Sequence, residues 1–168
     1  MKIPFILSIC FLLFVRAHAQ NGDLLHTPLP ATKEEFTASE PNVINTVNYL
    51  ETSSIDKEGD VWRAQASLLI QWISGSPQVK IEMREKILTF IKKNPELMAV
   101  YLGGWTKFVL QNNYSSDQLQ GNLAGLRSAI KVYKAGNGLK KDKEMDKYVK
   151  MEETGGLEVW VSEQLTKK

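Results

Sequence analysis

Apolar residues recur at every third or fourth position along most of the chain from residue 39 onward, which is the spacing of an amphipathic helix. The clearest example runs through Leu119, Leu123, Leu126, Ile130 and Tyr133. One similar stretch begins at 39–41. The others cover 57–73, 77–93, 95–112, the region from 115–117 to 136–138, 142–155 and 157–165. Because the polar breaks between them are short, the sequence predicts an all-α fold, a single antiparallel helical bundle of about six to seven helices.

Capping residues and glycines mark where these helices begin and end. Ser39 and Asn94 each stand shortly before a proline, Pro41 and Pro95, in the order that is typical of a helix start. Gly136 follows the next amphipathic stretch, where a left-handed glycine commonly ends a helix. No stretch alternates between apolar and polar residues for long enough to predict a strand.

The first nineteen residues have the organisation of a secretory signal peptide. Lys2 precedes an apolar run over 4–15, and a small-x-small pattern ending at Ala19 predicts cleavage between Ala19 and Gln20. A membrane anchor would need about 20 apolar residues, and this run is shorter. Lipidation of Cys10 is disfavoured because a bulky isoleucine precedes it. We therefore expect a periplasmic or extracellular protein.

The region after the predicted cleavage point lacks the helical period. Residues 20–38 contain Pro28, Pro30 and several small polar residues. Such a composition predicts an extended leader between the signal peptide, residues 1–19, and a helical domain over 39–168.

Removal of the signal peptide changes the charge balance of the protein. The 21 Lys and Arg lose Lys2 and Arg16, so 19 cations balance the 19 Asp and Glu. A neutral chain has no broad positive field for nucleic acid. Cys10 is the only cysteine, so the cleaved chain has no disulfide and depends on its apolar core. We expect a monomer with no membrane span after cleavage.

Composition also disfavours metal and cofactor sites. His26 is the one histidine of the cleaved chain, which is too few for zinc, copper or haem sites. The acids between Asp142 and Glu153 have part of the spacing of a calcium loop, but Lys147 stands where that loop requires glycine. We predict no metal site and no cofactor.

Two catalytic patterns are present in incomplete form. Residues 128–131 spell S-x-x-K, without the S-D-N and K-T-G motifs that accompany it in penicillin-binding enzymes. Neighbouring acids occur as the pairs Glu82 with Glu85 and Glu152 with Glu153. Such a pair would support hydrolysis of cell-wall or polysaccharide material only if a cleft held it and raised one pKa. We predict no catalytic residue.

Aromatic residues are the remaining candidates for a binding site. Trp72, Tyr101 and Trp105 fall in stretches that we assign to the interior, and Lys107 follows close behind, next to Gly103 and Gly104. Core packing is the favoured interpretation of these aromatic side chains. The alternative is that Trp72, Tyr101, Trp105 and Lys107 line a groove that receives a partner.

Four strings of the chain stand out, namely QWISGSP at 71–77, KNPEL at 93–97, GGWTK at 103–107 and GNLAGL at 121–126. Together they resemble a group of small secreted bacterial proteins that have no assigned function. The resemblance covers roughly residues 40–165 and implies a bacterial envelope location and an all-helical body, with no catalytic residues to transfer.

The function that these observations favour is non-enzymatic binding. We expect a secreted or periplasmic binding protein that recognises a protein partner, and one specific version is an inhibitor or immunity-type protein that blocks the active site of another protein. Two alternatives stay open. One is a carboxylate-dependent hydrolase, and the other is a small-ligand carrier with an apolar cavity among its helices.

Overall fold

The computed structural model describes residues 23–136 and 138–166, and every regular element within them is helical. The elements are α1 (Lys33–Thr52), α2 (Gly59–Gly75), the short 3₁₀ helix η1 (Thr89–Lys92), α3 (Leu97–Gln111), α4 (Gln118–Ala135), α5 (Lys143–Glu153) and α6 (Leu157–Thr166). The prediction of an all-α protein is confirmed, with six α-helices packed together in the described part. The predicted signal peptide, residues 1–19, lies outside the described residues.

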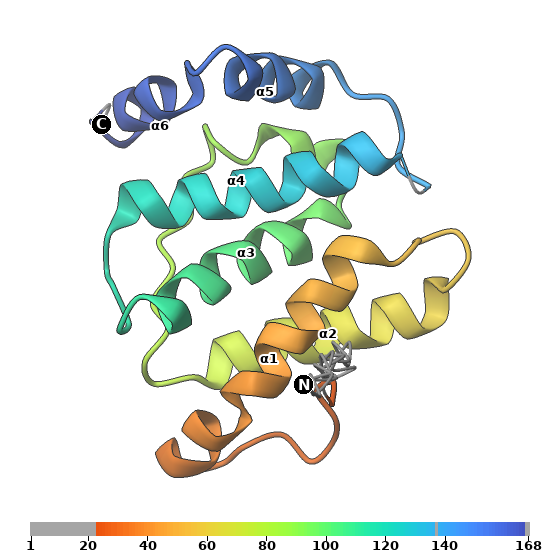
Figure 1. Ribbon diagram of the computed structural model, residues 1–168, viewed down its shortest axis with the longest axis vertical. Helices are drawn as coiled ribbons and strands as arrows, with labels where there is room; N and C mark the ends of the chain where they lie inside the picture. Colours follow the sequence, from red (N-terminus) through yellow and green to blue (C-terminus); the bar gives the residue numbers. More distant parts are fainter. Residues whose placement is uncertain (1–22, 137, 167–168) are drawn as a thin grey trace, which may run out of the picture.

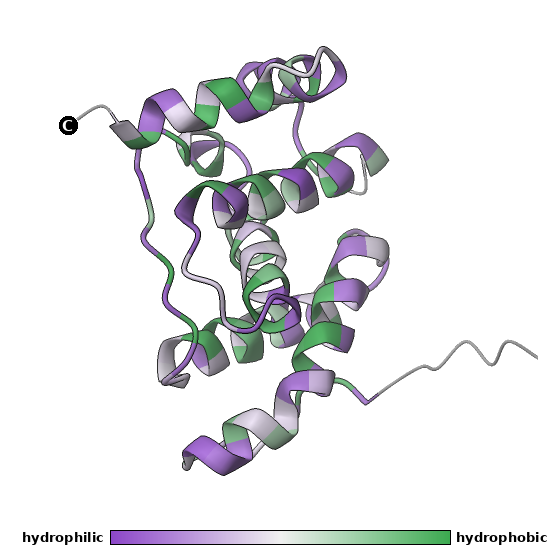
Figure 2. Cartoon of the chain, turned by 60° about the vertical axis from the view of Figure 1, so that its left-hand side comes forward, coloured by the Kyte–Doolittle hydropathy of each residue, from purple (hydrophilic) through white to green (hydrophobic). Residues whose placement is uncertain are grey.

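The helices stack in three tiers (Figure 1). Helices α3 and α4 form the middle tier and run in opposite directions, with α1 and α2 on one side and α5 and α6 on the other. Helix α3 contacts α1 and α2, and α4 contacts α5 and α6 and also α1. In Figure 2 the hydrophilic residues lie mainly along the outer sides of the helices, so the apolar core runs between the tiers.

Small residues let α3 and α4 approach closely. A Cβ atom added at Gly125 would lie 2.7 Å from the carbonyl oxygen of Tyr101. One added at Gly121 would collide with the indole of Trp105. Real Cβ atoms do not come this close to a neighbour, so the two helices pack at this distance only with glycine in both places.

Helix α1 begins earlier than the sequence predicts. Thr32 caps it, since the side chain of Thr32 accepts the backbone N–H of Glu35 at 3.3 Å while the Glu35 carboxylate accepts the N–H of Thr32 at 3.1 Å. This reciprocal capping box fixes the helix start. The expected start at Ser39, and the extended leader over 33–38, are therefore wrong, and Pro41 lies inside the helix.

The chain before α1 packs against the helices instead of extending away from them. Leu25 is buried, and its N–H donates to the hydroxyl oxygen of Thr46 at 2.9 Å. Its carbonyl accepts from the amide of Gln65 at 3.2 Å. These two hydrogen bonds attach the chain to α1 and α2.

The predicted helix over 77–93 is also wrong. Residues 76–88 form turns and irregular chain, and only η1 is helical in this region. At its C-terminal part a tertiary hydrogen bond stands where a helical one would be, because the hydroxyl of Tyr148 on α5 donates to the carbonyl of Ile87 at 3.1 Å. That carbonyl would otherwise accept the N–H of Ile91 in an α-helix; the N–H of Ile91 bonds to Leu88 instead.

Candidate functional site

The three aromatic residues predicted from the sequence lie in the core. Trp72, Tyr101 and Trp105 are each at most 1% exposed. The indole N–H of Trp72 donates to the hydroxyl of Ser39 at 2.8 Å, and the hydroxyl of Tyr101 donates to the side-chain oxygen of Asn122 at 2.6 Å. Burial raises the pKa of Tyr101 well above its ordinary value. The structure therefore leaves these side chains no surface that a partner could contact.

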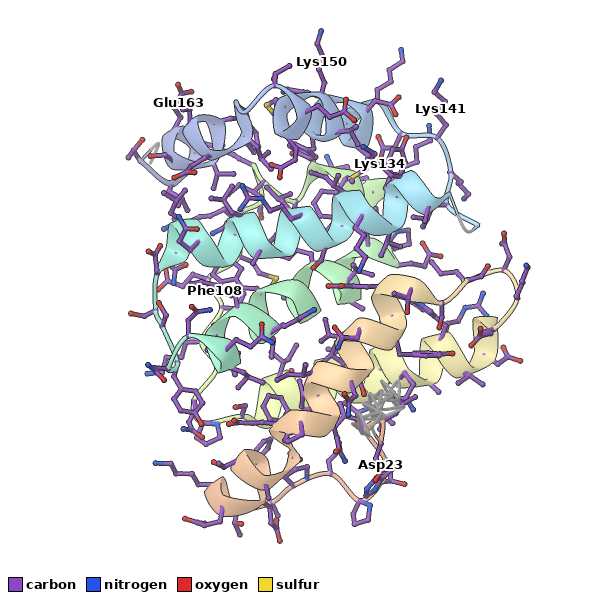
Figure 3. The ribbon with its side chains drawn as sticks, viewed as in Figure 1. Asp23, Phe108, Lys134, Lys141, Lys150 and Glu163 are labelled. Carbon is purple, nitrogen blue, oxygen red and sulfur yellow. The ribbon has the colours of Figure 1, made fainter. Side chains whose placement is uncertain are left out.

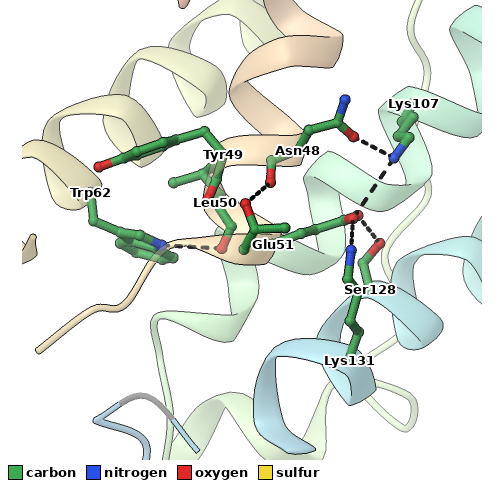
Figure 4. A network of polar contacts seen from close by, with 9 residues as sticks. Asn48, Tyr49, Leu50, Glu51, Trp62, Lys107, Ser128 and Lys131 are labelled. Atoms are coloured by element: carbon green, nitrogen blue, oxygen red, sulfur yellow. Dashed lines mark hydrogen bonds and ion pairs between the residues drawn. The ribbon is translucent and has the colours of Figure 1, made fainter. Parts of the chain in front are cut away.

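The fourth predicted residue, Lys107, belongs to a network of polar contacts around Glu51 (Figure 4). The ammonium of Lys107 donates to the side-chain oxygen of Asn48 at 2.6 Å and lies 3.7 Å from the Glu51 carboxylate. Lys107 approaches the Oε2 atom of Glu51, and the Oε1 atom accepts a hydrogen bond from the hydroxyl of Ser128 at 2.7 Å. Lys131 donates to the carboxylate at 2.9 Å. The network thus joins α1, α3 and α4.

The charge of Glu51 holds this network together. Burial raises the pKa of Glu51, but hydrogen bonds from Ser128 and Lys131 and the charges of Lys107 and Lys131 together lower it below its ordinary value. The carboxylate is therefore ionised and accepts from both members of the S-x-x-K pattern. A serine and a lysine that are both bound to a carboxylate are not poised as nucleophile and base, so we interpret the network as structural.

The predicted carboxylate pairs lie on the surface. Glu82 and Glu85 are exposed. Glu152 and Glu153 each form an ion pair of 2.8 Å with a cation of α4. Neither arrangement is a cleft with two facing acids, as hydrolysis requires. Within residues 23–136 and 138–166, no group of three or more metal-ligating side chains could hold a metal ion.

An open apolar hollow lies beside η1, at the segment that we predicted to be helical. We call it the η1 hollow; its volume is about 800 Å³, within the range of ligand sites. Met83, Leu88, Ile91 and Met98 supply its apolar lining. Its charged lining residues are Glu85, Lys86 and Lys92.

The segment that forms the floor of the η1 hollow is held in place by side chains that are buried in the core. Ile87 and Phe90 are fully buried, and the ring of Phe90 packs edge-on against Tyr148 with 6.0 Å between ring centroids. The hydroxyl of Tyr148 also lies 3.0 Å from that of Thr89. The buried side chains thus anchor the segment, while its other side chains face the opening.

A second anchor follows the hollow in the chain. Asn94 is 1% exposed. Its side-chain amide donates to the carbonyl of Lys140 at 2.9 Å, and its side-chain oxygen accepts the N–H of Lys140 at 2.8 Å. This two-way bond ties the segment to the loop before α5. Since both ends are held, the η1 hollow is formed before any ligand arrives.

Sequence reasoning missed the η1 hollow because apolar spacing made the segment resemble an amphipathic helix. One available signal was charge. Residues 80–93 contain five Lys and Arg against two Glu, in a chain that is neutral after the predicted cleavage. A basic, apolar stretch of this kind is a candidate binding surface wherever it lies.

Comparison with known proteins adds no relative. No family model, no curated protein and no solved structure matches this chain. The resemblance to small secreted bacterial proteins therefore stays a prediction. In the described part of the chain, no helix is both long and apolar enough to cross a membrane.

Proposed function

We propose that this is an exported, non-enzymatic binding protein whose ligand occupies the η1 hollow. The observation that carries the proposal is an open apolar cavity with an anchored floor. Met83 at its rim is 54% exposed, so an apolar side chain at the opening is available to a ligand. Export rests on the predicted signal peptide.

The lining of the η1 hollow favours binding over turnover. A carboxylate-dependent hydrolase needs two acids facing one another, and Glu85 is the only acid among the described residues that line the hollow. Lys86 and Lys92 are exposed cations that can attract a negative group but are not desolvated as a catalytic lysine would be. The arrangement therefore holds a ligand without acting on it.

A protein partner is the ligand that we favour. The hollow is open to solvent and rimmed by flexible methionines, which adapt to the side chains of a partner. A small-ligand carrier would enclose its ligand more completely. An inhibitor or immunity-type protein is a specific version of the proposal, because such a protein acts by contact alone. We expect the protein to act as a monomer.

The methionines provide a direct test. Met83 and Met98 line the η1 hollow, whereas Met145 is fully buried and Met151 lies on α5. Anilinonaphthalene sulfonate is an apolar anion that suits such a cavity. When it is titrated into protein carrying ¹³C-labelled methionine methyl groups, we expect the Met83 and Met98 signals to shift.

Met145 and Met151 are the internal controls for this titration. The signals of Met145 and Met151 should stay in place, because neither residue lines the η1 hollow. Equal shifts at Met83, Met98, Met145 and Met151, or no shift at Met83 and Met98, would contradict the proposal.

A further inference from the structure

We infer that the η1 hollow is one end of a longer groove that binds an amphipathic segment of a partner protein, with the acidic end of that segment in the η1 hollow. The inference rests on the proposed function and goes beyond it by naming the chemistry of the ligand. Three adjoining hollows and the charges around them support it.

A second hollow, of about 410 Å³, adjoins the first. Met98 lines both, so this flexible side chain lies where they meet. The second hollow follows one face of α2 through Trp62, Ala66 and Ile70, which are four residues apart and span about 12 Å of helix. Ile70 is 38% exposed. The second hollow is therefore elongated and apolar, as the middle of a peptide groove should be.

A third hollow, of about 540 Å³, continues the groove at the start of α2. Arg63 and Glu96 line both the second and the third hollow. The lining of the third is polar and predominantly acidic. Its acids are Asp56, Glu58, Asp60 and Glu96, against the cations Lys57 and Arg63.

The two ends of the groove thus carry opposite charge. Lys86 and Lys92 outnumber Glu85 around the η1 hollow, whereas acids outnumber cations two to one around the third. Complementary charges steer and orient a partner more than they raise its affinity. A segment with acids at one end, apolar residues in the middle and cations at the other end matches the groove in one orientation.

Two synthetic peptides of the same composition test this inference. Both have about 14 residues, enough to span about 21 Å as a helix. In the first, glutamates stand at one end, leucines in the middle and lysines at the other end; in the second, the glutamates and lysines alternate at both ends. Fluorescence anisotropy with the full protein should show the first peptide binding about tenfold more tightly. The difference should vanish in about 0.5 M salt.

Charge-reversal variants test whether the lysines of the η1 hollow cause the preference for the first peptide. The double variant Lys86→Glu/Lys92→Glu should abolish the preference for the first peptide. The matched control is Lys141→Glu/Lys150→Glu, which makes the same change in charge at two side chains that extend away from the body beside α5 (Figure 3). The control should retain the preference. Loss of preference in both double variants would overturn the inference, since net charge alone would then explain it.

The remaining outcomes separate the inference from the proposed function. If both peptides bind equally and shift Met83 and Met98, the inference is wrong and the proposed function stands. If anilinonaphthalene sulfonate shifts these methionines but neither peptide binds, a small ligand is the occupant and the inference is again wrong. If sedimentation shows a dimer of the wild type and a monomer of Met83→Ser, the occupant is a second copy, and the inference is wrong in that case too. If no probe shifts Met83 or Met98, the proposed function fails as well.

Discussion

The α3–α4 interface and the segment 76–96 are both rich in apolar residues, yet they use them in opposite ways. In the interface, glycines bring two helices so close that the aromatic side chains are sealed between them. In the segment, residues 82–86 are all exposed while Ile87, Leu88 and Phe90 are buried, and an open hollow remains. The comparison teaches that Tyr101 and Trp105 mark the interior of this protein, whereas the methionines beside η1 mark its accessible apolar surface.

The difference arises from which groups form hydrogen bonds with each region. Helices α3 and α4 bond to themselves, so their side chains are free to pack. The segment 76–96 instead bonds to groups from elsewhere in the chain, namely the hydroxyl of Tyr148, which donates to the carbonyl of Ile87, and the backbone of Lys140, which pairs with the side-chain amide of Asn94. A backbone held from outside can present apolar side chains to solvent without collapsing onto the core.

The largest expected effect on stability comes from removing a large buried side chain from the α3–α4 interface. Trp105→Ala should lower the free energy of unfolding by about 3–5 kcal/mol, because it leaves a cavity that the close-packed helices cannot fill. Urea denaturation followed by circular dichroism measures this. The matched change Trp160→Ala, at a partly exposed residue, should cost clearly less. Similar losses at both positions would contradict the comparison.

A smaller loss is expected from overfilling the same interface. Gly125→Ala should lower the free energy of unfolding by about 1–3 kcal/mol, because the new methyl group meets the carbonyl of Tyr101. Gly156→Ala is the control, since its nearest neighbour would be 3.8 Å away. Denaturation of the two variants side by side decides the point, and an unchanged stability of the first would refute the close approach.

The network around Glu51 should make stability depend on pH. Because the folded state lowers the pKa of Glu51 below its ordinary value of 4.5, its stabilisation is present above that pH and is lost as the pH falls through the folded pKa. The wild type should therefore lose more unfolding free energy than Glu51→Gln between pH 6 and about pH 3. Parallel pH profiles for the two proteins would contradict this role.

The anchors of the η1 hollow should have a modest effect on stability and a clear one on binding. Tyr148→Phe removes the bond to the carbonyl of Ile87 and should cost about 1 kcal/mol. The same variant should weaken the binding of anilinonaphthalene sulfonate, because the floor is released. Calorimetric titration measures the affinity for anilinonaphthalene sulfonate. An unchanged affinity in the variant would show that the floor does not need the bond from Tyr148 to Ile87.

The smallest expected change in stability is at the rim of the hollow. Met83→Ser removes an exposed side chain, so the free energy of unfolding should stay within about 0.5 kcal/mol of the wild type. Binding of anilinonaphthalene sulfonate should nevertheless fall. A large loss of stability, or unchanged binding, would mean that Met83 belongs to the core and not to a surface.

Much of the fold could be predicted from local patterns. The stretch that became α4 shows why, since Asp117 caps it by accepting the N–H of Gln120 at 3.0 Å and Gly136 ends it with a φ of 79°. Both signals are carried by single residues that act on their own neighbours. The capping box of Thr32 and Glu35 is a signal of the same kind, and attention to it would have placed the start of α1 correctly.

The candidate site could not be predicted in the same way. In the segment 77–93, the carbonyl of Ile87 accepts from Tyr148, which lies more than fifty residues away in the sequence, where an α-helix would use the N–H of Ile91. Periodicity in the segment itself carries no information about that bond. The burial of Trp72 and Trp105, in contrast, agrees with the core packing that apolar spacing favours.

Position-specific photocrosslinking in the cells that make the protein tests the central claim most directly. Met83 on the η1 hollow and Val159 on α6 are both exposed apolar residues, at 54% and 64%. A photoreactive amino acid placed at position 83 should yield a discrete crosslinked partner, and one at position 159 should not. A partner captured at 159 and absent at 83 would contradict the account.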